Sequence, residues 1–298
     1  MRIPDFSRSD SLVTQLQKLL TRQTSLQAQV SNGQRITKAS DDPDAMARVL
    51  KVQVDKQQVQ QWSNNGDRAL AVSQASYSAV KSLKSASDRA GEIAVLGVGI
   101  NTPDSYNAYA SEADGLIEQA VQTANSQQTG DHLFGGTKTD APPFTVTRDG
   151  SGKVTGVTYS GAAGAAQIRV SDSATITAQT DGATNQKLGT FINNLVALRD
   201  ALTAHDGTAV QAAQPALHTS ESDLIGTMSD LGATQARLES TQQDNQARFT
   251  QLEGLTSADT DADIAQTMVD LTRTQATYQA ALQSGAQLLQ HSLLDYLH

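Results

Sequence analysis

The sequence contains no cysteine, so it can form neither a disulfide bond nor a thiolate metal site. It also has no apolar run near the roughly 20 residues that a helix needs to span a bilayer, which argues against a membrane partner. Its first residues, Met1 to Ser7, lack the apolar segment of a secretory signal peptide. By that criterion we expect the protein to be cytosolic, or to be exported by a route that does not read such a signal.

Aromatic and basic residues are scarce as well. Aromatic residues make up 4% of the chain and hydrophobic residues 38%, and the mean hydropathy is -0.38. Large, bulky cores are therefore not expected, whereas the abundance of Ala, Gln, Ser, Thr and Leu favours long, slim helices. The net charge of -9 and the pI near 4.9 leave no basic stripe to neutralise phosphates, which argues against a nucleic-acid partner.

Both ends of the chain carry apolar residues at the steps of a heptad repeat. From Ile264, steps of four and three lead through Leu271 and Tyr278 towards Tyr296, and the first helical stretch repeats the pattern from Leu12 to Val30. Such stripes indicate helices that pack along other helices. The expected assembly and coiled-coil interface consists of Leu12, Leu16, Leu19, Leu26, Val30, Ile264, Met268, Leu271, Tyr278, Leu282, Leu289 and Tyr296.

A single pair of such helices offers few apolar contacts for the number of residues that it orders. We therefore expect the two ends to order fully only against neighbouring molecules, which points to an assembly protein. The alternative, that the heptads form only a helical core within one chain, stays open.

Between the two ends, helical patterns surround a short β-rich stretch. The pattern predicts one or two helices from Asp44 to about Gly97 and another from Asp104 to Gln128. A further helix is predicted to begin near Asn185. A heptad pattern follows over 217–252, and we expect Gly254 and the acidic segment after it to separate that helix from the C-terminal one.

The middle of the chain alternates apolar and polar residues. Phe144–Thr147 and Val154–Tyr159 flank an Asp-Gly turn, which is typical of a β-hairpin, and residues 167–170 and 175–177 resemble further short strands. The predicted fold is mainly α, with long antiparallel helices or a coiled coil from both chain ends and a small β-rich insertion. The predicted domains are a terminal coiled-coil domain (1–45 and 256–298), a helical rod domain (46–138 and 185–255) and a small β domain (139–184).

The sequence predicts no catalytic residue, no cofactor and no metal site. The five histidines are scattered, and we expect each to be a surface or helix-end residue. The run Gly135–Thr139 lacks the spacing of a phosphate-binding loop, which favours a turn. Asp259, Asp261 and Asp263 have the spacing of the first three ligands of a calcium-binding loop. Ile264, however, stands where that loop requires glycine, so helix capping is the better interpretation.

Two segments near opposite ends of the chain resemble one family. Ser31-Asn32-Gly33-Gln34-Arg35-Ile36, followed by Ala39-Ser40-Asp41-Asp42-Pro43, is similar to the N-terminal signature of flagellin-type proteins. Asp261-Ala262-Asp263-Ile264-Ala265, with Leu271-Thr272-Arg273-Thr274-Gln275, is similar to their C-terminal signature. The signature residues that we carry over are Asn32, Gly33, Arg35, Ile36, Asp41, Asp42, Pro43 and Arg273.

Within that family, two features resemble the hook-associated proteins of the hook–filament junction more than the filament flagellins. One is Leu133–Thr139 before Pro142-Pro143-Phe144, which is similar to a segment leading into the β domain of the junction proteins. The other is the ending Leu293-Leu294-Asp295-Tyr296-Leu297, where flagellins tend to end in a basic residue.

The resemblance implies a structural, non-enzymatic protein of the bacterial flagellum. It implies terminal helices that pair in the inner tube and are largely disordered in the free monomer, with the helical and β domains facing outward. It further implies export without a cleaved signal through the flagellar type III channel and an extracellular location at the hook–filament junction. The implied partners are copies of the chain in a ring, hook-associated protein 1, flagellin and an export chaperone.

Two other functions remain possible from the sequence. A filament-forming flagellin would share the tube mechanism but polymerise without limit, because a heterologous interface that does not close generates a helix. A secreted enzyme or adhesin would use the β insertion, although that segment shows no convergent set of acid, base and nucleophile.

Overall fold

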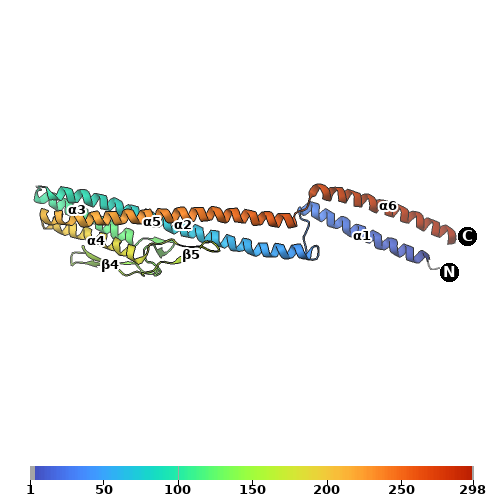
Figure 1. Cartoon of the computed structure of the whole chain (residues 1–298), viewed down its shortest axis with the longest axis horizontal. Helices are drawn as coiled ribbons and strands as arrows, with labels where there is room; N and C mark the ends of the chain where they lie inside the picture. Colours follow the sequence, from blue (N-terminus) through green and yellow to red (C-terminus); the bar gives the residue numbers. More distant parts are fainter. Residues whose placement is uncertain (1–3, 100, 297–298) are drawn as a thin grey trace. The chain divides into compact units, whose positions relative to one another are not determined.

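The computed structural model describes the backbone of residues 4–99 and 101–296 and the side chains of residues 10–99 and 101–287 (Figure 1). The helices are α1 (Pro4–Asn32), α2 (Pro43–Val98), α3 (Pro103–Ala124), α4 (Gly182–Thr203), α5 (Gly207–Thr260) and α6 (Ile264–Tyr296). The strands are β1 (Gln127–Gln128), β2 (Asp131–His132), β3 (Phe144–Arg148), β4 (Val154–Tyr159), β5 (Gln167–Arg169) and β6 (Thr175–Thr177). The predicted fold class, long helices with a small β-rich insertion, is confirmed.

The chain divides into two compact units. Residues 1–58 and 249–298 form unit 1, and residues 59–248 form unit 2. The helices α2 and α5 each contribute one end to unit 1 and the rest to unit 2. The finer division into three domains stays a prediction.

The two longest helices follow the sequence pattern with one correction. The side chain of Asp42 caps α2, because its Oδ1 accepts a hydrogen bond of 3.0 Å from the Ala45 amide, and Pro43 occupies the first helical position. The acidic segment does separate this helix from α6, between Thr260 and Ile264, but Gly254 takes no part in the break because it lies inside α5. One glycine opposes a helix by only about 1 kcal/mol, and the buried Leu252 lies in the same turn.

Unit 2 is built around four helices. The α3 and α4 helices lie beside each other, and α2 and α5 run antiparallel. Gln214 Nε2 on α5 donates to the Ala94 carbonyl on α2 at 3.1 Å, and Gln235 Nε2 donates to the Ser73 carbonyl at 3.2 Å. The largest fully buried aliphatic and aromatic side chains between these helices include Leu83, Ile93, Ile117, Phe191, Ile192, Leu195 and Leu198.

The β-rich stretch packs along these helices. The predicted hairpin is present as β3 and β4, with Phe144 opposite Tyr159, and β5 pairs with β6. Two asparagines outside the hairpin each hydrogen-bond both the amide and the carbonyl of one hairpin residue, as a neighbouring strand would do. Asn193 on α4 accepts from the Val157 amide at 2.8 Å and donates to its carbonyl at 2.9 Å, and Asn125 does the same for Phe144. The helix expected to reach Gln128 ends at Ala124 instead, and the chain continues into the short pair β1 and β2.

Candidate assembly site

The two chain ends form an antiparallel helix pair within unit 1 (Figure 1). On α1, the predicted positions face α6 and are half-buried, namely Leu12, Leu16, Leu19, Gln23, Leu26 and Val30. The heptad interpretation of the first helix therefore agrees with the burial of its side chains.

The inner face of α6 is a stripe of mostly small residues. Thr267, Thr274 and Gly285 are buried, and Leu271, Tyr278 and Ala281 are half-buried between them. Buried hydroxyl groups need partners, and both threonines find them on their own helix. Thr267 Oγ1 donates to the Asp263 carbonyl and Thr274 Oγ1 to the Asp270 carbonyl, each at 2.7 Å. Threonine can thus occupy the inner face without an unpaired polar atom.

Three predicted interface residues of α6 lie away from α1. Ile264, Met268 and Leu282 are exposed, with 54% of Met268 and 45% of Leu282 accessible to solvent. Leu271 and Tyr278 do lie against α1. Leu289 and Tyr296 lie within the α6 backbone, and their side chains fall outside the described residues. The contact inside one chain is therefore only part of the predicted stripe.

Most of the large exposed hydrophobic residues of α1 and α6 gather on one side of the helix pair, and Val269 is the exception. Val13 and Leu20 each follow an inner position of α1 by one residue, and Met268 and Leu282 each follow an inner position of α6 by one residue. Successive residues turn by about 100° around a helix. Because α1 and α6 are antiparallel, the residue after an inner position points to the same side on both helices. We call this side, formed by Val13, Leu20, Ile264, Met268 and Leu282, the apolar face.

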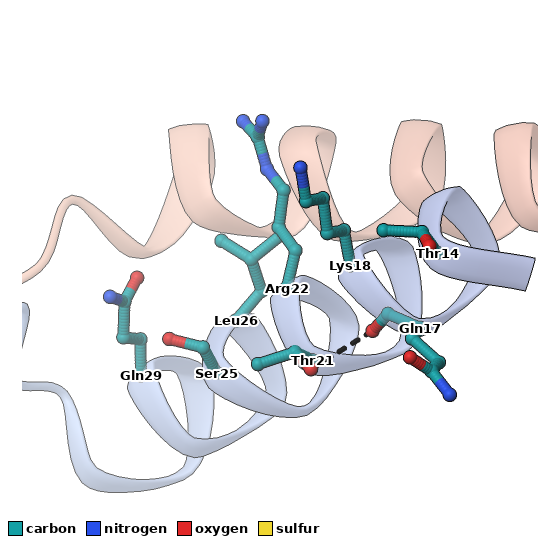
Figure 2. Close-up of a pocket in the computed structure, with 8 residues that line it drawn as sticks. All are labelled: Thr14, Gln17, Lys18, Thr21, Arg22, Ser25, Leu26 and Gln29. Atoms are coloured by element: carbon teal, nitrogen blue, oxygen red, sulfur yellow. Dashed lines mark hydrogen bonds between the residues drawn. The ribbon is translucent and has the colours of Figure 1, made fainter. Parts of the chain in front are cut away.

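The opposite side of α1 is polar. A shallow hollow of about 660 Å³ there is lined by Thr14, Gln17, Lys18, Thr21, Arg22, Ser25, Leu26 and Gln29. Figure 2 shows Lys18 and Arg22 pointing to the same side of α1, and Thr21 Oγ1 donating to the Gln17 carbonyl at 2.9 Å. The helix pair thus has one apolar and one polar face.

A compact joint connects this pair to the ends of α2 and α5 in the same unit. Gly33 ends α1 with a φ of +70°, a conformation that glycine adopts without strain. The Arg35 amide donates to the Thr260 carbonyl at 2.7 Å, and the Ala262 amide donates to the Gly33 carbonyl at 2.9 Å. These two bonds hold the connection between α1 and α2 against the connection between α5 and α6.

The N-terminal signature residues build this joint. Ile36 is buried, and the carboxylate of Asp41 accepts from the amides of Thr37 at 3.0 Å and Lys38 at 2.9 Å. These backbone hydrogen bonds lower the pKa of Asp41 below its ordinary value. The hydrogen bond from the Ala45 amide, with a smaller contribution from Arg35, likewise lowers the pKa of Asp42.

Two signature residues have no comparable role in the joint. Asn32 is the exposed last residue of α1. Arg273 is exposed on α6, and within the described residues its guanidinium forms no ion pair. Their place in the candidate site therefore stays a prediction.

Asp259 is the residue of the joint that the sequence misassigned. Asp263 does cap α6, since its Oδ1 accepts from the Gln266 amide at 3.1 Å. Asp259 instead lies inside the last turn of α5, where its carboxylate binds Arg48 of α2 with Nη2–Oδ1 at 2.6 Å and Nε–Oδ2 at 3.2 Å. The Arg48 hydrogen bond lowers the pKa of Asp259. Because the two residues are 211 positions apart, no local pattern indicates the pair.

The described residues offer little for other chemistry. Across that part of the chain, His, Asp and Glu side chains nowhere form a set of three that could hold a metal ion. His132, expected near the surface, is buried, and its Nδ1 lies 2.9 Å from the Asn125 carbonyl oxygen. None of the helices over residues 4–99 and 101–296 has the length and apolar content that a membrane crossing requires.

The N-terminal half of this architecture matches a known family. The model of the bacterial flagellin N-terminal helical region covers residues 8–139, which include most of α1, the connection from α1 to α2, and all of α2 and α3. Over these residues, which are less than half of the chain, it resembles bacterial flagellin.

Several solved structures share the fold of this chain. A chain assigned as a flagellar hook-associated protein of Vibrio parahaemolyticus is 17% identical, with a TM-score of 0.66 over 74% of this chain and 100% of that one. FlgL of Bacillus cereus is 19% identical, with a TM-score of 0.60 over 70% and 99%. The flagellar junction protein FlgL of Legionella pneumophila is 13% identical, with a TM-score of 0.53 over 72% and 100%. No protein of curated function matches the chain in sequence.

Proposed function

We propose that this chain is a hook–filament junction protein, with the role of hook-associated protein 3. A ring of copies would join hook-associated protein 1 on the hook side to flagellin on the filament side. The observation that carries the proposal is the shared fold, which extends over nearly the full length of solved chains named FlgL, hook-associated or junction protein. The two sequence features that favour the junction branch support the same assignment.

The proposed mechanism is packing without chemistry. Within one chain, α1 and α6 cover each other's inner faces, and this leaves the apolar face for neighbouring molecules. Exposed aliphatic side chains that gather on one side of a protein commonly mark an interaction surface. Between residues 264 and 287, α6 carries only two charged side chains, Asp270 and Arg273. Few charges would therefore lose water when this helix enters an assembly.

The proposal includes the remaining partners and the location. The chain would leave the cell unfolded through the flagellar type III channel, guided by an export chaperone, and act outside the cell as a non-enzymatic part of the axial structure. The predicted interface residues, including Leu289 and Tyr296, would order fully on assembly. The β-rich stretch would face outward.

Electron microscopy of hook ends tests this function. Purified full-length protein is added to isolated hooks that carry hook-associated protein 1, with and without flagellin. We expect a short segment that stops growing by itself and then supports filament growth when flagellin is added. Hook ends that stay bare, or that fail to support flagellin, would refute the junction role.

A filament-forming flagellin is the second candidate, and the match to the flagellin N-terminal region favours it. Such a protein would extend the same hook ends into long filaments without any added flagellin. The experiment therefore separates the two candidates by the length of the segment that the purified chain forms alone.

A further inference from the structure

Asp259 carries a negative charge at a position where the helix itself disfavours one. It lies in the last turn of α5, which ends at Thr260, and the C-terminal end of a helix carries partial negative charge. An aspartate there is destabilising unless cations offset it. Two arginines from a distant part of the sequence, Arg35 and Arg48, supply the positive charge.

The two arginines reach Asp259 from different elements. Arg48, in the second turn of α2, holds the carboxylate with two hydrogen bonds of 2.6 and 3.2 Å. Arg35, in the connection after α1, donates from Nη2 to the Asp259 carbonyl at 2.9 Å, and from Nη1 to Asp42 Oδ2 at 3.3 Å. The carbonyl of Asp259 is one of those that a helix end leaves without an intrahelical partner. One residue of α5 is thereby tied to the loop before α2 and to α2 itself.

We propose that Asp259 is the positioning residue of the terminal helix pair. By holding Arg35 and Arg48 together, it fixes the direction in which the chain leaves α5 towards α6 and enters α2 from α1. The orientation of α1 and α6 against the ends of α2 and α5 within unit 1 follows from that clamp. The consequence for assembly rests on the proposed function, whereas the positioning itself does not.

The geometry requires this particular pair of side chains. A carboxylate presents two acceptor oxygens to the planar fork of a guanidinium, whereas an asparagine presents one acceptor and one donor. A lysine at position 48 would supply the charge but not the two fixed hydrogen bonds. Asp259→Asn and Arg48→Lys therefore test the same clamp from its two sides while keeping nearly the same side-chain size.

The absence of native cysteine makes a direct measurement possible. Cysteines at the exposed positions Ala28 on α1 and Lys51 on α2 would carry spin labels, and pulsed electron resonance would give their distance distribution in the full-length protein. We expect one narrow distance for the parent chain. For Asp259→Asn and for Arg48→Lys we expect a broadened distribution with a displaced second population.

Glu253→Gln is the matched control. Glu253 pairs with Lys56 at 3.3 Å between the same two helices of the same unit, about two turns from Asp259. Its removal should leave the distance distribution unchanged. Circular dichroism of each variant should give the parent helix content, which separates a lost clamp from a lost fold. A distribution for Asp259→Asn that equals the parent would overturn the proposal.

Assembly on hook ends provides the second readout. We expect Asp259→Asn to be incorporated less often than Glu253→Gln. Without the clamp, its α1–α6 pair would adopt many orientations relative to the ends of α2 and α5 before it binds. Equal incorporation of the two variants would also count against Asp259 as the positioning residue. If the parent chain itself does not add to hooks, the junction role fails, and the distance measurement still decides the role of Asp259.

Discussion

Leu12 of α1 packs against the bare backbone of Gly285 on α6. A Cβ atom built on Gly285 would lie 2.9 Å from Leu12 Cδ2, closer than side-chain atoms normally approach. The absence of a side chain at this position lets the N-terminal part of α1 lie close to the C-terminal part of α6. Gly285 is thus part of the inner face of the pair, although it has no apolar side chain.

Gly285→Leu should loosen the helix pair. The added side chain has no room beside Leu12, and overpacking of this kind destabilises a contact by about 1–3 kcal/mol. Hydrogen exchange measured by mass spectrometry should show faster exchange along α1. Gly254→Leu is the control, because nothing lies within 4 Å of its Cβ position. Equal exchange of α1 in the two variants would contradict the packing described here.

Leu282→Asp and Leu271→Asp should differ in their effect. Leu271 lies half-buried on the inner face, so an aspartate there should separate α1 from α6 in the isolated chain. Leu282 lies on the apolar face, so its variant should keep the pair intact and fail to incorporate at hook ends. Hydrogen exchange along α1 and the hook-end assay report the two effects separately. Normal incorporation of Leu282→Asp would mean that the apolar face is not covered in the assembly.

The heptad pattern predicted that α6 packs along a helix, but it did not identify which stripe faces α1. Ile264, Met268 and Leu282 have the size expected of interface residues, whereas Thr267 and Thr274 do not. The threonines lie inside because their hydroxyls bond to carbonyls of their own helix, which a count of apolar residues does not register. A sequence cannot separate a stripe buried within one chain from a stripe available to a neighbour, since both are apolar.

Local signals predicted the rest of the fold well. The Asp-Pro pair at positions 42 and 43 indicated the start of α2, and the Asp-Gly turn indicated the hairpin of β3 and β4. Contacts between distant segments were not predictable in this way. Arg48 and Asp259 meet only because α2 and α5 run side by side, and no spacing in the sequence relates them.

Acid should open the joint. Arg48 lowers the pKa of Asp259, and backbone hydrogen bonds chiefly lower the pKa values of Asp41 and Asp42, all from an ordinary value of 3.8. Groups whose pKa falls on folding stabilise the folded form above that ordinary value and stop doing so as the pH falls through the lower, folded value. The stabilisation by these carboxylates should thus be complete at neutral pH and disappear below about pH 4.

The label pair at positions 28 and 51 measures this opening. We expect a constant distance distribution from pH 8 to about pH 5 and a broadening below about pH 4. Circular dichroism should show at each pH whether the helices remain folded. An opening that begins near pH 6 would point to histidine instead of these carboxylates and would contradict the assignment.

Arg199 should be the charged residue on which unit 2 depends most. Its side chain is buried, and Nη1 donates to Asp114 Oδ1 on α3 at 2.9 Å and to the Val154 carbonyl of β4 at 2.8 Å. Arg199→Met would leave that carbonyl and that carboxylate without their donor. Removing one member of a buried ion pair destabilises a protein by about 3 kcal/mol. Urea unfolding of the full chain, followed by circular dichroism, should show a loss of this size.

Lys187→Met is the control for Arg199→Met, because both lie on α4 and both lose an ion pair. Lys187 binds Asp223 through one contact of 2.8 Å, without the two-pronged geometry of an arginine pair, and 55% of its side chain is exposed, so water replaces the lost partner. Its variant should unfold within about 0.5 kcal/mol of the parent chain. If the two variants were equally stable, Arg199 would not hold β4 and α3 to α4, and the hairpin would depend on Asn125 and Asn193 for its attachment.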